Sequence, residues 1–139
     1  TAAMSIMIEP IGRVESPIKD LAQAVRQSDE GAPAVTVVLD PRVLDAITGL
    51  QPGTELMLLT WLDRADRSVL KNHPRRDPSR PITGVFCTRS PNRPNPIGLH
   101  RVRVTAINGN RLELEGLEAV DGTPVLDIKG LLAENIAER

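Results

Sequence analysis

The chain has 139 residues and a formal net charge of −1, with no secretory signal and no apolar run approaching the ~20 residues of a membrane-spanning helix. These features predict one cytoplasmic domain over residues 1–139, in which the three residues before Met4 are candidates for an expression remnant. Trp61 and Phe86 are the only aromatic residues, which excludes a nucleic-acid site built on a platform of stacked rings. Cys87 is the only cysteine, and no Cys/His grouping has zinc-ligand spacing, so neither a disulfide framework nor a metal is expected.

The first part of the chain predicts two strands and a short helix. Residues 5–15 alternate loosely between apolar and polar positions, and residues 34–39 are a compact β-branched run, which is typical of a strand. Asp40 then has the character of an N-cap, with Pro41 at the first helical position. The apolar face of the short helix that follows is expected to consist of Val43, Leu44 and Ile47.

The middle of the chain alternates between apolar runs and polar stretches. Residues 55–62 form a continuous apolar run and predict a buried central strand. Residues 63–81 are polar and hold several prolines and arginines, and a connection of this length is typical of a functional loop. Residues 83–88 predict a strand that leads into a proline-rich stretch.

The last third predicts hairpins. Residues 99–107 alternate, with Val102 and Val104 on one face, and the pair Asn108–Gly109 is a strong hairpin signal. Leu112, Leu114 and Leu117 continue the second arm, and Asp121–Gly122 predicts another turn before a strand over residues 124–128. Many short strands with turn signals predict an all-β, β-dominated fold: a small antiparallel β-barrel with one short helix and long polar loops.

Residues 88–98 form a proline-rich loop that stands out chemically. Three prolines fix φ and push the residues before them towards extended geometry, so the loop is stiff and costs little entropy to order. It carries four polar side chains that could meet an anionic or hydrogen-bonding ligand: Arg89, Asn92, Arg93 and Asn95. The alternative is a rigid connector with solvated arginines.

Basic residues are concentrated between Arg64 and Arg103. This interval holds ten of the 17 lysines and arginines and only two of the 18 acids, so its formal charge is +8 against −9 for the rest. Such a distribution suits an anionic partner such as a nucleic acid or a phosphate. The alternative is that these arginines pair with acids elsewhere in the fold.

No dinucleotide-binding glycine fingerprint, Walker lysine loop or Gly-x-Ser-x-Gly elbow is present. A nucleotide-type cofactor would therefore have to be held by other means.

The run GVFCTRSPNRPNPIGLHRV (residues 84–102) resembles the signature of the TsaA-like family, also called the YaeB or TrmO family. Three further segments fit the same family: residues 11–17, the pair Arg26–Gln27 and residues 121–129. The resemblance implies a small antiparallel barrel, usually found as a homodimer. It also implies an S-adenosylmethionine-dependent methyltransferase that N-methylates the threonylcarbamoyl-modified adenosine of transfer RNA.

The resemblance further implies positions for the sites. Cofactor contacts are expected after the Arg–Gln pair, at the end of the central strand, at the first arginine of the proline-rich loop, just beyond that loop, and at the late turn: Ser28, Asp29, Glu30, Asp63, Arg64, Arg89, Leu99, Asp121, Gly122, Thr123 and Pro124. Asn92, Arg93 and Asn95 are the candidates for substrate contact, because they share the stiff loop with Arg89. No residue is assigned as the catalytic base.

The sequence departs from the family pattern in ways that leave the methyl acceptor open. Asp63 stands where many members have a histidine, and the chain ends at Arg139 without the C-terminal extension of the larger bacterial members. Two alternatives therefore stand beside the transfer RNA enzyme. One is a methyltransferase for a small metabolite, and the other is a non-catalytic sensor that binds S-adenosylmethionine.

Overall fold

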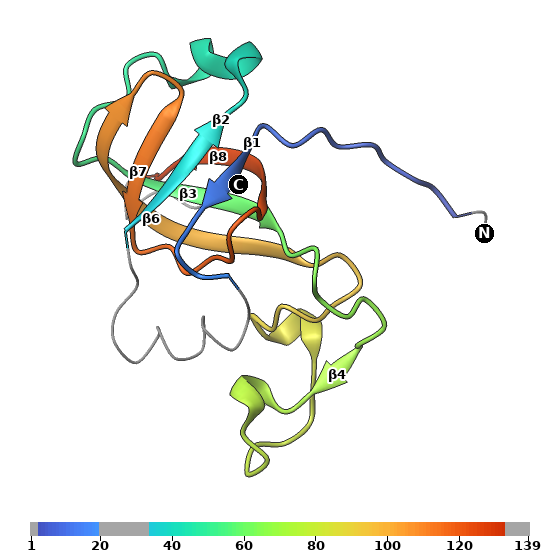
Figure 1. Ribbon diagram of the computed structural model, residues 1–139. Coiled ribbons are helices and arrows are strands. Elements are labelled where there is room, and N and C mark those ends of the chain that lie inside the picture. Colours follow the sequence, from blue (N-terminus) through green and yellow to red (C-terminus); the bar gives the residue numbers. More distant parts are fainter. Residues whose placement is uncertain (1–2, 20–33, 133–139) are drawn as a thin grey trace.

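The computed structural model describes residues 3–19 and 34–132, and its centre is a closed six-stranded antiparallel barrel (Figure 1). The strands follow the order β1-β2-β7-β6-β3-β8 around the barrel, and β1 closes it by pairing with both β2 and β8. Their bounds are β1 Gly12–Glu15, β2 Val35–Leu39, β3 Glu55–Trp61, β6 Ile97–Asn108, β7 Arg111–Glu115 and β8 Pro124–Gly130. The predicted antiparallel barrel is confirmed. No helix among the described residues has the length and apolar character needed to cross a membrane.

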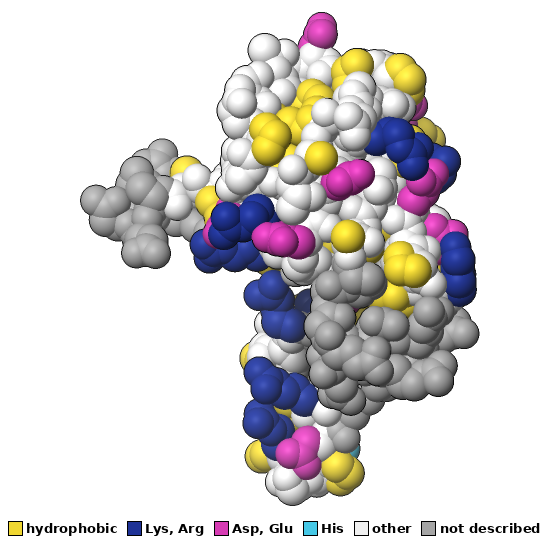
Figure 2. Space-filling model, turned by 60° about the vertical axis from the view of Figure 1, so that its left-hand side comes forward, with side chains coloured by type: hydrophobic (Ala, Val, Ile, Leu, Met, Phe, Trp, Pro, Cys, Tyr) yellow, Lys and Arg dark blue, Asp and Glu magenta, His cyan; other side chains and the backbone are white. Residues whose placement is uncertain are grey.

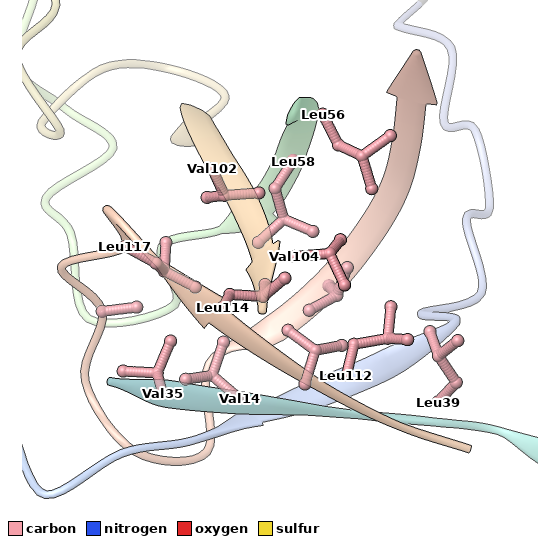
Figure 3. Packing of buried hydrophobic residues seen from close by; sticks show 13 residues of the cluster. Val14, Val35, Leu39, Leu56, Leu58, Val102, Val104, Leu112, Leu114 and Leu117 are labelled. Carbon is pink, nitrogen blue, oxygen red and sulfur yellow. The ribbon is translucent and has the colours of Figure 1, made fainter. Parts of the chain in front are cut away.

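The barrel interior is filled by aliphatic side chains, as the near-absence of aromatic residues requires. Alternate residues of each strand point inward, which is the period-2 pattern of a sheet with one buried face. Figure 3 shows these side chains converging from all sides of the barrel: Val14, Val35, Leu39, Leu56, Leu58, Val102, Val104, Leu112, Leu114 and Leu117. Each of them is at least nine-tenths buried, so the core is dry and continuous.

Strand β3 is amphipathic rather than buried on both faces, which corrects the prediction from its continuous apolar run. Leu56, Leu58 and Thr60 point into the barrel, whereas Met57 and Leu59 are only half-buried on the outside. The pattern differs because a barrel strand has one core face, while a fully buried strand needs a layer on both faces.

The first strand is shorter than the alternation of residues 5–15 predicted. It begins at Gly12, and Ile6 and Ile8 are exposed in a segment without regular structure. Pro10 lacks an N–H, and Ile11 makes the first ladder-like bond to the carbonyl of Val125 at 2.8 Å.

The predicted helix is confirmed as a 3₁₀ helix, η1 Pro41–Ile47, capped by Asp40. The Asp40 carboxylate accepts a hydrogen bond from the backbone N–H of Arg42 at 3.0 Å, which satisfies one of the free donors at the helix start. Val43 and Ile47 pack against the core, but Leu44 points outward, because a 3₁₀ helix has three residues per turn and a narrower buried face.

Residues 62–96, here called the arm, connect β3 to β6 and project from one end of the barrel (Figure 1). The arm contains a small two-stranded sheet, β4 Lys71–Asn72 with β5 Thr83–Gly84, and two single-turn segments, η2 Pro74–Arg76 and η3 Val85–Cys87. The strand predicted over residues 83–88 therefore ends at Gly84. The chain turns there because the Thr88 N–H bonds back to the Val85 carbonyl at 3.1 Å.

Two glycine turns set the register of the last strands. The β6–β7 loop consists of Gly109 and Asn110, one position later than predicted, and the positive φ of 60° at Gly109 fits the first central position of a type II′ turn. The Asp121–Gly122 turn is confirmed, with φ of 85° at Gly122 and a Thr123 N–H bond to the Val120 carbonyl at 3.1 Å.

Candidate functional site

A pocket of ≈ 790 Å³, here called the rim pocket, lies where the arm joins the barrel. Its walls come from the end of β3 and the following turn, from residues 89–93 of the proline-rich loop, from the start of β6, and from residues 118–120 with Thr123. Three of these segments are far apart in sequence. The antiparallel pairing of β3 with β6 places the end of β3 beside the start of β6, since Trp61 pairs with Ile97.

The rim pocket carries charges of both signs that have no counter-ion among the described residues. Arg64 donates to the Lys19 carbonyl at 3.1 Å, and Arg89 donates to the Leu99 carbonyl at 3.3 Å, so each guanidinium keeps further donors available. Asp63 and Glu118 line the same pocket and are exposed. Such a site suits a small ligand that is itself zwitterionic.

Apolar surface faces these charges. Leu59, Leu62, Ile97 and Leu99 also line the rim pocket, and Ile97 and Leu99 remain about two-fifths exposed. Strongly exposed leucine and isoleucine at the mouth of a polar pocket are typical of a surface that a ligand or partner covers.

Arg93 holds the proline-rich loop in shape. Its partly buried guanidinium donates to three backbone carbonyls, those of Ser90 at 2.7 Å, Val85 at 2.8 Å and Thr88 at 2.7 Å. These bonds tie the loop to the preceding single turn η3. Most donors of Arg93 are therefore engaged, and its main contribution in this structure is to position the neighbouring residues.

The two asparagines of the loop fasten it to the turn after β3. Asn92 accepts from the backbone N–H of Asp66 at 2.9 Å, and Asn95 accepts from Arg67 at 3.0 Å. Arg67 also lies over the Trp61 ring, with its guanidinium carbon 5.2 Å from the ring centroid. Asn92 lines the rim pocket, whereas Asn95 does not.

His100 lies at the inner edge of the rim pocket and was given no role by sequence reasoning. Its Nε2 is 2.8 Å from the Thr60 hydroxyl, and both side chains sit over Gly98, where a Cβ would come within 2.4 Å of the Thr60 oxygen. Burial, and then the positive charge of Arg89, lowers the pKa of His100 from 6.5 to about 4. The histidine is therefore neutral near pH 7. The sequence did indicate that His100 points inward, because it shares one face of its strand with Val102 and Val104.

The Asp121–Gly122 turn contributes only the residue that follows it to the rim pocket. Thr123 is buried and lines the rim pocket, but Asp121, Gly122 and Pro124 do not line it. The Asp121 carboxylate instead accepts from the Ser16 N–H at 2.9 Å and pairs with Lys19 at 3.0 Å, contacts that lower the pKa of the carboxyl. Asp121 thus anchors the turn that presents Thr123.

The structure brings together seven of the residues predicted for the sites: Asp63, Arg64, Arg89, Asn92, Arg93, Leu99 and Thr123. Asn95, Asp121, Gly122 and Pro124 lie outside the rim pocket, and Ser28, Asp29 and Glu30 lie outside the described residues. The pocket also includes residues that the sequence did not single out: Leu59, Leu62, Ala65, His100, Glu118, Ala119 and Val120.

The alternative interpretation of the basic interval, that its arginines pair with acids elsewhere in the fold, holds for part of it. Arg101 and Arg103 bind Glu55 on the outside of the barrel, at 2.6 and 3.0 Å, and the pair lowers the pKa of Glu55, mainly through Arg101. Arg64 and Arg89, in contrast, form no ion pair with a described residue and face the rim pocket. No three metal-ligating side chains gather among residues 3–19 and 34–132.

Fold and site together define a class: small closed antiparallel barrels with a polar pocket at the rim. The family model of the tRNA-methyltransferase O N-terminal domain matches residues 13–135. The chain belongs to this family.

Known proteins agree with this membership. The chain is 41% identical over 126 residues to a probable S-adenosyl-L-methionine-binding protein of Methanothermobacter thermautotrophicus, with 91% of this chain and 90% of the relative covered. It is 39% identical over 126 residues to a protein of the same name from Archaeoglobus fulgidus, covering 91% of this chain but only 34% of the relative. The crystal structure of TrmO from Pseudomonas aeruginosa superposes with a TM-score of 0.70 at 31% identity, covering 99% of this chain and 61% of that one. The chain thus spans about a third of one relative and three fifths of the solved enzyme.

Proposed function

We propose that this protein is an S-adenosylmethionine-dependent methyltransferase and that the rim pocket binds the cofactor. One observation carries the proposal. The end of β3 and the first arginine of the proline-rich loop, two segments that the family resemblance assigns to the cofactor, meet in a single pocket. At ≈ 790 Å³ the pocket is within the ~300–1,000 Å³ typical of small-molecule sites.

The charges and apolar walls fit the parts of the cofactor. Arg89 and Arg64 offer spare guanidinium donors to its carboxylate, a geometry that arginine suits. Asp63 accepts from its ammonium group or ribose hydroxyls, and the leucines cover the adenosine. Thr123 lines the wall directly, and contact by Asp121, Gly122, Pro124 and residues 28–30 stays a prediction.

The chain's role in methyl transfer is to position the reactants. The cofactor supplies an electrophilic methyl group, and holding a nucleophile in line with it can lower a barrier by ~7–11 kcal/mol. The loop that carries Arg89 is stiffened by its prolines and by the carbonyl bonds of Arg93. No described residue is assigned as the base that takes the proton from the nucleophile.

The proposed methyl acceptor is transfer RNA, at its threonylcarbamoyl-modified adenosine. Support comes from the family description and from Arg64, Arg75 and Arg89 of the arm, which form no ion pair with a described residue. Binding that depends on such arginines should weaken steeply as salt rises. Labelled S-adenosylmethionine incubated separately with bulk RNA and with a metabolite pool would show which acceptor is methylated, and transfer to metabolites alone would contradict the proposal.

The cofactor assignment predicts the effect of Arg89→Ala. Losing a charge-assisted hydrogen bond costs about 1.5–3 kcal/mol, so the affinity for S-adenosylmethionine should fall at least about tenfold in calorimetric titration. Arg101→Ala is the matched control, because Arg101 binds Glu55 outside the rim pocket. Equal cofactor affinity in wild type and Arg89→Ala would place the cofactor elsewhere.

A binding-only role is the second candidate, favoured by the names of the relatives that this chain covers most completely. The Methanothermobacter protein is named for cofactor binding and not for transfer. Tight cofactor binding with no methylation of RNA or metabolites would support this sensor role.

We further propose a homodimer with the cofactor site near the subunit boundary. Ile97 and Leu99 leave apolar surface uncovered at the mouth of the rim pocket, which a two-fold partner could cover. Sedimentation at micromolar concentration should show a dimer, and a monomer with full cofactor affinity would overturn this assembly.

A further inference from the structure

A second hollow of ≈ 760 Å³, here called the arm pocket, lies on the arm beside the rim pocket. It is lined by residues 73–75 on one side and by residues 86–92 on the other. Residues 89–92 line both pockets, so the two hollows lie on either side of one proline-rich wall. Of the residues that line the arm pocket, the cofactor assignment uses only Arg89.

Phe86 is the most unusual residue of the arm pocket. Its side chain is 84% exposed, although it is the only phenylalanine in the chain. The backbone beneath it is held firmly, because Val85 is buried and its carbonyl accepts from Arg93 at 2.8 Å. The ring is therefore an exposed aromatic surface that projects from an anchored stretch of backbone at the edge of a pocket.

Unpaired positive charge accompanies this ring. Arg75 and Arg89 line the arm pocket, and neither forms an ion pair with a described residue. Arg75 has a φ of 54°, the one positive value at a described non-glycine residue, and backbone in this region is costly and often found at functional sites. Figure 2 shows Lys and Arg side chains outnumbering acidic ones on the visible face of the arm, which forms the lower part of that view.

We infer that the arm pocket binds a nucleotide of single-stranded RNA next to the nucleotide that is methylated. Phe86 stacks on the base, and Arg75 contacts a phosphate. One exposed ring suffices for one base, so this site is compatible with a chain that has too few aromatic residues for a platform. Because residues 89–92 line both pockets, a nucleotide held in the arm pocket lies beside the proposed cofactor, which is where the nucleotide to be methylated must also lie. The inference rests on the proposed function of the rim pocket.

The test uses a fluorescently labelled single-stranded oligoadenylate and fluorescence anisotropy in the presence of S-adenosylmethionine. Removing a base–aromatic stack costs ~1–3 kcal/mol, so Phe86→Ala should weaken RNA binding roughly 5- to 150-fold. Phe86→Trp should bind like wild type. Arg75→Ala should lower the slope of log affinity against log salt by ~0.7, as expected for one phosphate contact on a single strand.

Leu70→Ala is the matched control, since Leu70 is 66% exposed on the same arm but lines neither pocket. Its RNA affinity should be unchanged. Equal RNA affinity in Phe86→Ala and wild type would overturn the inference. A wild-type dimer that becomes a monomer in Phe86→Ala would also overturn it, because a second copy of the chain would then cover the ring. Calorimetry with the cofactor separates the two proposals: Phe86→Ala should keep full cofactor affinity, and absence of binding to wild type would instead defeat the proposed function.

Discussion

The Thr60–His100 contact places an ionisable ring between a dry core and a polar pocket. The ring is partly buried, one of its nitrogens is 2.8 Å from the Thr60 hydroxyl, and the nearby Arg89 charge opposes protonation. Burial and the Arg89 charge both favour the neutral imidazole. The residue thus offers the pocket a polar but uncharged surface beside Arg64 and Arg89.

The depressed pKa of His100 predicts how stability depends on pH. His100 binds a proton near pH 6.5 in the unfolded chain but only near pH 4 in the folded protein. The stability that comes from keeping His100 neutral is therefore complete above pH 6.5 and is lost as the pH falls towards 4. Between about pH 7 and 4.5, the free energy of unfolding measured in urea should fall by about 2 kcal/mol more in wild type than in His100→Gln. The same pH dependence in both proteins would contradict this account. The acids with lowered pKa values, such as Asp121, act at lower pH and in both proteins alike.

At the scale of an element, the proline-rich loop is stiff for two independent reasons. Its prolines restrict φ, which the sequence predicted, and Arg93 binds three carbonyls, which it could not predict because backbone partners depend on the folded path. Arg93 was expected to contact substrate. It lines the rim pocket, but most of its donors are used to hold the loop.

Arg93→Lys should loosen this loop without unfolding the barrel. An ammonium cannot reproduce the fork that binds the carbonyls, and each lost bond is worth about 0.5–1.5 kcal/mol. Hydrogen exchange of the Thr88 amide, which bonds to Val85, should therefore accelerate, reflecting a local opening free energy roughly 1–3 kcal/mol lower. The Val104 amide, bonded to Thr54 in the barrel, serves as the reference. Equal changes at both amides would show that the barrel had been destabilised instead.

Elements were predictable from sequence where pattern and turn chemistry agreed. The hairpin at Gly109, the capped helix after Asp40 and the alternation of β6 are local features. The arm was missed as a structured unit because β4 and β5 have two residues each, too few to show a period. Its shape depends on tertiary contacts, such as that of Asn92 with the turn after β3.

At the scale of the whole molecule, stability resides in the aliphatic barrel core. Leu58 is fully buried, and Leu58→Ala should lower the free energy of unfolding by about 2–5 kcal/mol through lost burial and the cavity left behind. Leu70→Ala on the arm should change it by less than about 0.5 kcal/mol, because that side chain is exposed. Urea titration of both variants checks this. A similar loss in both would mean that the arm and barrel share one core.

The sequence predicted some residues of the rim pocket and missed others. The family resemblance predicted Asp63, Arg64 and Arg89, and the pairing of β3 with β6, which joins the two ends of the arm, brings them into one pocket. Glu118 and Ala119 were missed because they belong to a polar connection with no pattern of its own, and only the three-dimensional path brings them to the pocket. Asp121 was selected for its turn, and the structure shows that its carboxylate faces Ser16 and Lys19 instead.

The arm leaves and re-enters the barrel at almost one point. Trp61 pairs with Ile97, and the Leu62 N–H bonds to the Pro96 carbonyl at 2.8 Å. The arm is therefore an insertion within a single hairpin of β3 and β6. Its length and residues can change while the two strands keep their register. Under the proposed function, selection for new methyl acceptors would act on the arm, and grafting the arm between related barrels would change substrate preference while the barrel stays the same.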